Sequence, residues 1–222
     1  TNLDVVDIDG AVDMASTLLV TGNVDFNGDL DVDGTTNLDV VDVDGAVNFA
    51  ADVTFADGAD IITASAGTSN VRFGVNAGNS IESGGNYNTV VGDEAGTAIT
   101  TGDYNTALGY QAGAAVTTGI QNSLIGGTAG DALTTGSYNT ALGISALTRD
   151  TAGSKSVAIG TTALAYQNFT SATDAFNTAV GHEAGLSVTT GVQNTLIGGL
   201  AGDAITTGGY NTAIGGKSLT GA

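Results

Sequence analysis

The chain has 222 residues, with 35 Gly but no Pro, no Cys and no Trp. Its formal charge of −19 repels a phosphate backbone and argues against nucleic-acid binding. The lack of Cys excludes disulfides and thiol chemistry, and no apolar run is long enough for membrane insertion. Proline lacks the backbone donor that a β-ladder needs, so its absence fits a chain built mostly of ladders.

Residues 1–69 follow a pattern of their own. They carry fourteen Asp and no Glu, Lys or Arg. Apolar residues come in i, i+2 pairs such as Leu18/Val20 and Leu30/Val32, which predicts short strands with one buried face. One chain has too little apolar surface per turn here for a stable core. We therefore expect this segment to form an acidic short-strand β-stalk in which three chains pool their apolar surface.

An Asp-x-Asp-Gly motif recurs in this segment and suggests a metal site. Asp29, Asp31 and Asp33, followed by Gly34, match the first half of a calcium loop. The twelfth position of that loop needs a bidentate acid, and here it is Val40. We favour solvated Asp side chains on strand faces and at turns. Calcium held by these three Asp is the alternative, because uncompensated carboxylates repel one another. No other cofactor is expected.

A 17-residue unit recurs through residues 70–222. Its third and fourth positions are apolar, and a later apolar position is followed by Thr-Thr-Gly. The unit is too short for a pair of helices, and its Gly and β-branched residues oppose helix. One such unit cannot bury its own apolar face, but stacked units share a core. The predicted fold class is therefore all-β: a β-solenoid or β-roll of 17-residue repeats, preceded by the β-stalk.

Two columns of the repeat are candidate structural sites. Asn tolerates turn conformations, and stacked amides can bond from unit to unit, so we predict an Asn ladder. Its members are Asn88, Asn105, Asn122, Asn139, Asn177, Asn194 and Asn211. The fifth position is the predicted turn glycine, at Gly92, Gly109, Gly126, Gly143, Gly160, Gly181, Gly198 and Gly215. We interpret both columns as structural.

Residues 148–176 interrupt the repeat. The step from Ser156 to Asn177 is longer than the regular step by four positions, and the Thr-Thr-Gly signature is lost. An insertion in a rod bulges outward, and loops on rigid scaffolds are where binding tends to occur. We expect any direct contact with a host to lie in this segment.

No catalytic arrangement is predicted. His182 is the only histidine, and it occupies the variable sixth position of the repeat. Without Cys or a clustered acid pair outside the repeat, no nucleophile and base come together. The Thr-Thr pairs suggest an ice-binding face, but neighbouring strand residues point to opposite faces, so ladder packing is favoured. We therefore expect no enzyme activity.

The run Asn105-Thr-Ala-Leu-Gly, repeated almost unchanged from Asn139 and Asn211, resembles repeats of bacteriophage tail fibres. It is also similar to the head repeats of trimeric autotransporter adhesins. The run Gly28-Asp-Leu-Asp-Val-Asp-Gly34 resembles the shaft repeats of such fibres. Both families imply an intertwined parallel homotrimer.

The resemblance also implies a function. The chain would be a rigid trimeric spacer in a viral tail fibre of the virion, supporting attachment to a cell-surface receptor or glycan. The alternative is a bacterial surface adhesin or a self-assembling extracellular filament. Neither function involves membrane insertion or nucleic-acid binding by this segment.

Overall fold

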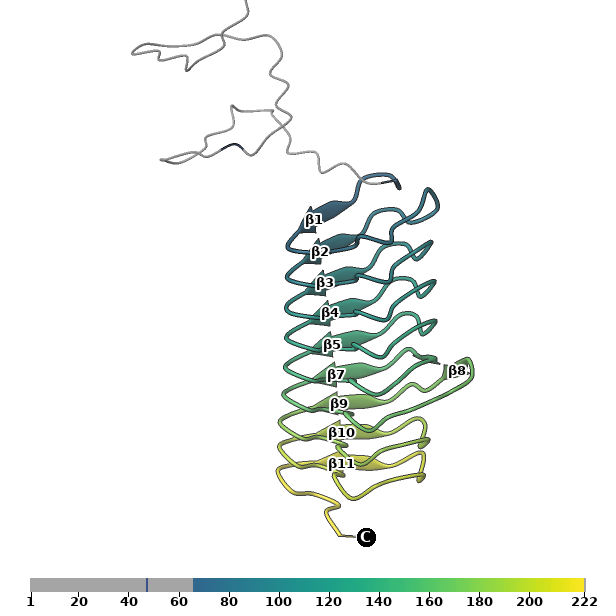
Figure 1. Ribbon diagram of the computed structural model, residues 1–222. Coiled ribbons are helices and arrows are strands. Elements are labelled where there is room, and N and C mark those ends of the chain that lie inside the picture. Colours follow the sequence, from purple (N-terminus) through teal and green to yellow (C-terminus); the bar gives the residue numbers. More distant parts are fainter. Residues whose placement is uncertain (1–46, 48–65, 222) are drawn as a thin grey trace, which may run out of the picture. The chain divides into compact units, whose positions relative to one another are not determined.

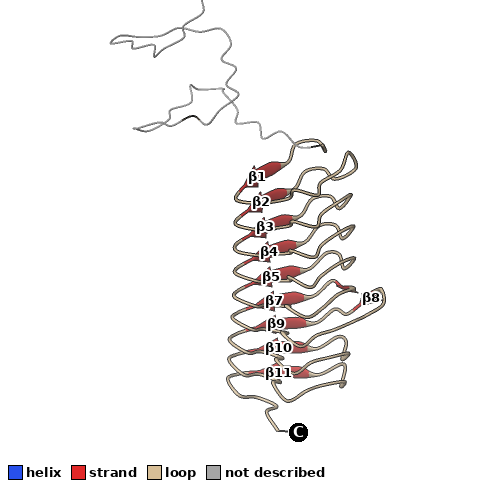
Figure 2. Cartoon of the chain, in the orientation of Figure 1, coloured by secondary structure: helices blue, strands red, loops and turns tan. Residues whose placement is uncertain are grey.

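The computed structural model describes residues 47 and 66–221; Asp29, Asp31, Asp33 and the rest of the expected stalk, apart from residues 47 and 66–69, lie outside this part. The described residues form strands and turns without any helix, so the expected all-β solenoid is confirmed for them (Figure 2). Nine strands stack into one parallel sheet (Figure 1). They are β1 (Val71–Phe73), β2 (Thr89–Val91), β3 (Thr106–Leu108), β4 (Ser123–Ile125), β5 (Thr140–Leu142), β7 (Val157–Ile159), β9 (Thr178–Val180), β10 (Thr195–Ile197) and β11 (Thr212–Ile214).

Each strand pairs in parallel with the next strand of this sheet. Thr106 of β3 pairs with Ser123 of β4, so equivalent positions of consecutive repeats lie side by side. Each repeat therefore makes one turn of the solenoid, which we call a rung, with a strand on one wall and turns on the other. The longest step joins β7 to β9, where Val157 pairs with Thr178.

The extra residues of that step lie beside the main stack. Two short strands, β6 (Gly153–Ser154) and β8 (Thr173–Asp174), form a second parallel sheet of their own. In Figure 1 β8 stands outside the stack of nine strands. The insertion thus leaves the main register intact, because β5, β7 and β9 still pair residue for residue.

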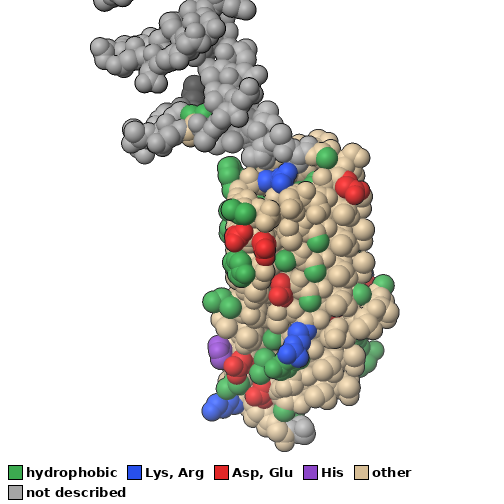
Figure 3. Space-filling view, in the orientation of Figure 1, with side chains coloured by type: hydrophobic (Ala, Val, Ile, Leu, Met, Phe, Trp, Pro, Cys, Tyr) green, Lys and Arg blue, Asp and Glu red, His purple; other side chains and the backbone are tan. Residues whose placement is uncertain are grey.

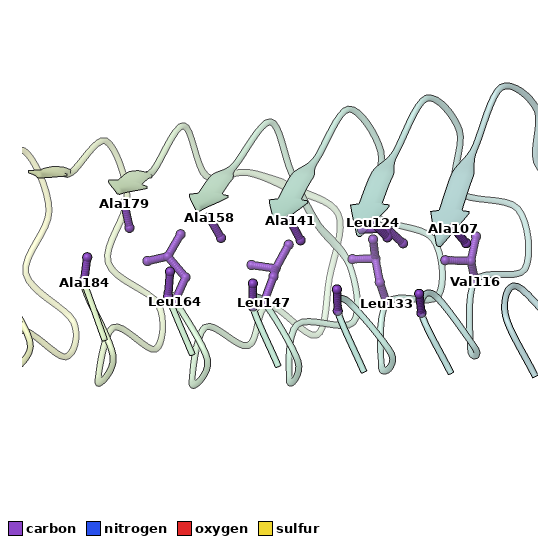
Figure 4. Packing of buried hydrophobic residues seen from close by; sticks show 14 of the residues in the cluster. Ala107, Val116, Leu124, Leu133, Ala141, Leu147, Ala158, Leu164, Ala179 and Ala184 are labelled. Carbon is purple, nitrogen blue, oxygen red and sulfur yellow. The ribbon is translucent and has the colours of Figure 1, made fainter. Parts of the chain in front are cut away.

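The core lies between the strand wall and the turn wall (Figure 4). In the nine-stranded sheet, the middle residue of every strand after β1 points inward and is buried, for example Val90, Ala107 and Leu124. From the opposite wall each rung before that of β11 adds a buried Ala, such as Ala129, and most rungs add a larger apolar residue, such as Leu133. Rungs share these contacts with their neighbours, so one continuous core runs the length of the solenoid.

The Thr-Thr pairs contribute to the turn wall. The hydroxyl of Thr117 donates to the carbonyl of Thr134 at 3.2 Å, and Thr134 donates to the carbonyl of Thr151 at 2.8 Å. The second member of the pair, such as Thr118 or Thr135, is exposed. The first threonine of the pair therefore bonds from rung to rung, which agrees with ladder packing.

Candidate functional site

The predicted Asn residues lie in a column at the start of the strands, and all of them except the half-buried Asn211 are buried. Asn122 Nδ2 donates to Asn105 Oδ1 at 3.0 Å and to the carbonyl of Gly136 at 2.9 Å. Its Oδ1 accepts from the backbone N–H and from Nδ2 of Asn139, at 3.0 and 3.2 Å. Both ends of the amide are therefore used inside the solenoid, and the amide of Asn122 is not available to a ligand.

The column is interrupted at Ser156, and a residue from elsewhere in the repeat replaces the missing amide. Ser156 donates its backbone N–H to Asn139 Oδ1 at 2.9 Å, but its side chain has no amide. Gln167 Nε2 donates to Ser156 Oγ at 3.0 Å, and Gln167 Oε1 accepts from Asn177 Nδ2 at 2.8 Å. The amide of Gln167 thus continues the hydrogen-bonded column across the irregular rung.

Gln167 has a buried acidic partner in Asp150. Asp150 Oδ2 accepts from Gln167 Nε2 at 2.5 Å, and its Oδ1 accepts from the backbone N–H groups of Gly153 and Phe169, both at 3.0 Å. Three donors satisfy this carboxylate, which no Lys or Arg pairs with in the described chain. We call Asp150, Ser156, Gln167 and Asn177 the buried polar network.

This network occupies space that is apolar in other rungs. Asp150 and Gln167 stand at the twelfth repeat position, where the other rungs place buried aliphatic residues: Ile99, Val116, Leu133, Val188 and Ile205. In the same two rungs, Leu147 and Leu164 replace the glycine found at the ninth position of most others. Both leucines are fully buried and project from the turn wall into the core in Figure 4.

The two leucines adopt an unfavourable backbone conformation. Their φ angles are 56° for Leu147 and 49° for Leu164, in the left-handed region that costs a branched side chain about 1 kcal/mol. Glycine avoids that cost, but here it would leave the core underfilled. The leucines restore apolar volume where Asp150 and Gln167 have removed it.

We expect Asp150→Ala to lower the free energy of unfolding by about 3–5 kcal/mol. The substitution leaves the backbone N–H groups of Gly153 and Phe169 buried without an acceptor, and Gln167 Nε2 keeps only Ser156 Oγ. Asp93→Ala is the matched control, because Asp93 is exposed and its effect should stay within about 0.5 kcal/mol. Urea unfolding of both variants measures the difference. Equal midpoints would show that the buried network contributes nothing to stability.

The two rungs that contain Asp150 and Gln167 also carry a cation and an aromatic ring on their surface. The guanidinium carbon of Arg149 lies 4.3 Å from the ring centre of Tyr166, and both residues are exposed. In the same irregular segment, Lys155 Nζ contacts Asp174 Oδ2 at 2.6 Å and lies 5.1 Å from the ring centre of Phe176. Two of the four basic residues of the chain therefore gather at the irregular rungs.

Other candidate groups do not assemble into a site. His182 is exposed, with Nε2 3.8 Å from Glu183 Oε1. Among residues 47 and 66–221, no three His, Cys, Asp or Glu side chains come together as metal ligands. A pocket of about 250 Å³ at the rung of β11 has no ionisable side chain in its lining. The predicted turn glycines all have positive φ and contribute backbone only.

The irregular segment was recognisable from sequence, but its chemistry was missed. Asp150 and Gln167 stand out only when their repeat position is compared with the aliphatic residues of other rungs. The same comparison singles out Arg149 and Tyr166, because position 11 is otherwise Ala, Ser or Gly from the rung of β2 onward. The four-residue insertion after Gln167 obscured this alignment.

Comparisons with known proteins give no assignment. No protein-family model matches the chain, and no curated protein and no solved structure matches it. Within the described residues no helix is long and apolar enough to cross a bilayer.

Proposed function

We propose that the chain is a structural segment of a fibre, a rigid homotrimeric spacer that supports attachment to a host cell. The proposal includes the 17-residue repeat as its building unit and an acidic stalk formed by residues 1–69. Its action is mechanical, without catalysis, and the tail fibre of a virion is the setting that the sequence resemblance suggests.

The main support for this proposal is the outer face of the nine-stranded sheet. The last residue of each strand points outward and is apolar in every case: Phe73, Val91, Leu108, Ile125, Leu142, Ile159, Val180, Ile197 and Ile214. The first residue of each strand shares that face and is Thr, Ser or Val. An uncharged face thus runs the length of the solenoid. We call it the aliphatic face.

A bare aliphatic face is unusual for a parallel sheet. Parallel sheets are normally covered on both faces, and here the core covers only the inner one. Leu108 and Leu142 are 45% and 44% exposed, and Ile214 is 68% exposed. Extended apolar surface of this kind marks a place where proteins associate. Packing of several chains by their aliphatic faces would cover it, and the resemblance to fibre repeats favours three chains.

The solenoid also has the mechanical character of a spacer. Its strands are joined by a regular parallel ladder, and the buried Asn column adds bonds between neighbouring rungs. Each rung contacts mainly its neighbours, so length grows with repeat number while the cross-section stays the same. Charged side chains are sparse on the face drawn in Figure 3.

We expect the double substitution Leu108→Glu and Leu142→Glu to lower the solution mass from three chains to one. Two carboxylates per chain would face one another across a desolvated interface, which disfavours association. The control carries Thr118→Glu and Thr135→Glu, which add the same charge on the turn wall. Sedimentation velocity compares the two. A trimer that survives the leucine substitutions would exclude the aliphatic face as the interface.

A further inference from the structure

We propose that Arg149 and Tyr166 form a platform that binds a carboxylate-bearing sugar of a surface glycan. This inference rests on the proposed function, in which the fibre meets a host cell. It adds the residues that make the contact and the chemical class of the ligand.

The solenoid itself does not require these two side chains. The equivalent position in the other rungs from β2 onward holds a small residue: Ala98, Ala115, Ala132, Ser187 or Ala204. Arg149 and Tyr166 are exposed, so neither fills the core. Their neighbours along the column, Ala132 and Ser187, are small on both sides, which leaves the pair standing above its surroundings.

The guanidinium of Arg149 is arranged to bind an oxyanion. The guanidinium carbon of Arg149 lies over the ring of Tyr166, which holds this cation at the surface through a cation–π contact. In the described part of the chain no carboxylate lies within ion-pair distance of Arg149. Two acids of these rungs have other partners, since Asp131 accepts from Thr148 and Asp174 pairs with Lys155. A planar guanidinium binds a carboxylate through two parallel hydrogen bonds.

Tyr166 supplies the second half of the platform. Arg149 lies over one face of its ring, and the equivalent position in the next rung holds the small residue Ser187. Tyr166 donates its backbone N–H to Leu186 at 3.1 Å, which fixes it against that rung. The described residues place no other ring or cation against Tyr166. The free ring face suits the C–H face of a pyranose, which is apolar.

The platform is held by the buried polar network beneath it. Arg149 precedes Asp150 in the chain, and Tyr166 precedes Gln167. The inward side chains of Asp150 and Gln167 are hydrogen-bonded to each other. Asp150 also binds the backbone N–H of Phe169. Order already present in the free protein reduces the entropy lost on binding. This explains why a polar network that interrupts an apolar core occurs in these two rungs.

A saccharide fits the surroundings better than a small enclosed ligand. Asn168, Thr170 and Ser171 follow Tyr166 in the chain, are exposed, and offer an amide and hydroxyls to sugar hydroxyls. A shallow exposed surface also suits a chain molecule that lies along the fibre. The acidic character of the protein predicts weak binding per site, and three sites in a trimer would raise the avidity.

The test uses the full chain and a galacturonic acid hexamer as the probe, with binding measured by calorimetry at low salt. The fully methyl-esterified hexamer is the matched ligand, because it keeps the sugar rings and loses the charge. We expect saturable binding of the acid form and at least about tenfold weaker binding of the ester, equivalent to the loss of about 1.4 kcal/mol. Equal binding of both, or no binding of the acid form, overturns the proposal.

Variants assign the binding to the platform. Arg149→Gln and Tyr166→Ala should each weaken binding by at least about tenfold, and Arg149→Lys should weaken it because lysine lacks the planar fork. Lys217→Gln and Tyr110→Ala are the controls, since both wild-type residues are exposed elsewhere on the solenoid. Unchanged urea midpoints show that each variant is folded. Binding that survives Arg149→Gln contradicts a site at Arg149. If inorganic phosphate at the same charge concentration abolishes binding of the hexamer, the site takes any oxyanion, which contradicts a site for a sugar.

The solution mass separates this inference from the proposed function. A trimer that fails to bind the acid hexamer overturns the platform and leaves the spacer. A monomer that binds the hexamer through Arg149 overturns the trimeric spacer and leaves the platform.

Discussion

Gly126→Ala is expected to lower the free energy of unfolding by about 4 kcal/mol or more. A Cβ on Gly126 would lie 2.6 Å from the carbonyl oxygen of Gly143 and 2.7 Å from its carbon, both in the next rung. These are backbone atoms of the ladder, so they cannot move aside without breaking strand pairing. The φ angle of 130° adds strain for any residue with a Cβ.

The control for this substitution is the adjacent residue. A Cβ on Gly127 meets nothing within 4 Å. Gly127→Ala should therefore leave stability unchanged, or raise it by up to about 1 kcal/mol by restricting the unfolded chain. Urea unfolding followed by circular dichroism measures both variants. Similar midpoints for the two alanines would contradict the close approach of rungs at Gly126.

The consequence of Gly126→Ala should extend beyond its own rung. In a repeat protein each rung is stabilised largely by the interfaces with its two neighbours. β4 follows β3 and precedes β5 in the sheet, so a displaced turn after β4 disturbs both interfaces. We expect unfolding of this variant to lose cooperativity, with the rungs of β9 to β11 melting after those around β4.

Asn122→Ala is expected to cost about 3–4 kcal/mol. The substitution removes an amide that makes four hydrogen bonds, and it leaves the carbonyl of Gly136 and the backbone N–H of Asn139 buried without those partners. An apolar side chain cannot replace these bonds. The unpaired groups belong to two different rungs, so the damage is shared across the ladder.

Gln121→Ala is the control for the Asn ladder. Gln121 precedes Asn122 in the same turn but is exposed, and its backbone N–H bond to Asp103 survives the change. Its unfolding free energy should change by no more than about 0.5 kcal/mol. Thermal and urea unfolding of the pair provide the comparison. A small loss for Asn122→Ala would mean that water satisfies the groups around it.

The regular spacing of the 17-residue repeat made the solenoid predictable from sequence. A fixed spacing of Asn and Gly, with apolar residues between them, indicates rungs that stack in parallel with identical residues in register. Asn122 and Gly126 illustrate this, because their residue types match what a turn and a close backbone approach demand. The insertion after Gln167 was also recognisable, because it makes one repeat longer than the others.

Other features have no local signal. The third and fourth positions are both apolar, so sequence does not say that Leu124 is buried while Ile125 and its equivalents form the aliphatic face. Tyr104 and Gln111 adopt positive φ of 57° and 53°, although neither residue type predicts a left-handed conformation. Gln167 replaces the amide missing at Ser156 from another point of the repeat, which becomes visible only when the two residues meet in space.

The central claim is that three chains associate through the aliphatic face, and the mass of the intact 222-residue chain in solution tests it most directly. Light scattering on a sizing column gives this mass at several protein concentrations. We predict three times the 21.6 kDa of one chain, independent of concentration. A mass that grows with concentration would favour a self-assembling filament. A mass of one chain at all concentrations would contradict the trimeric fibre.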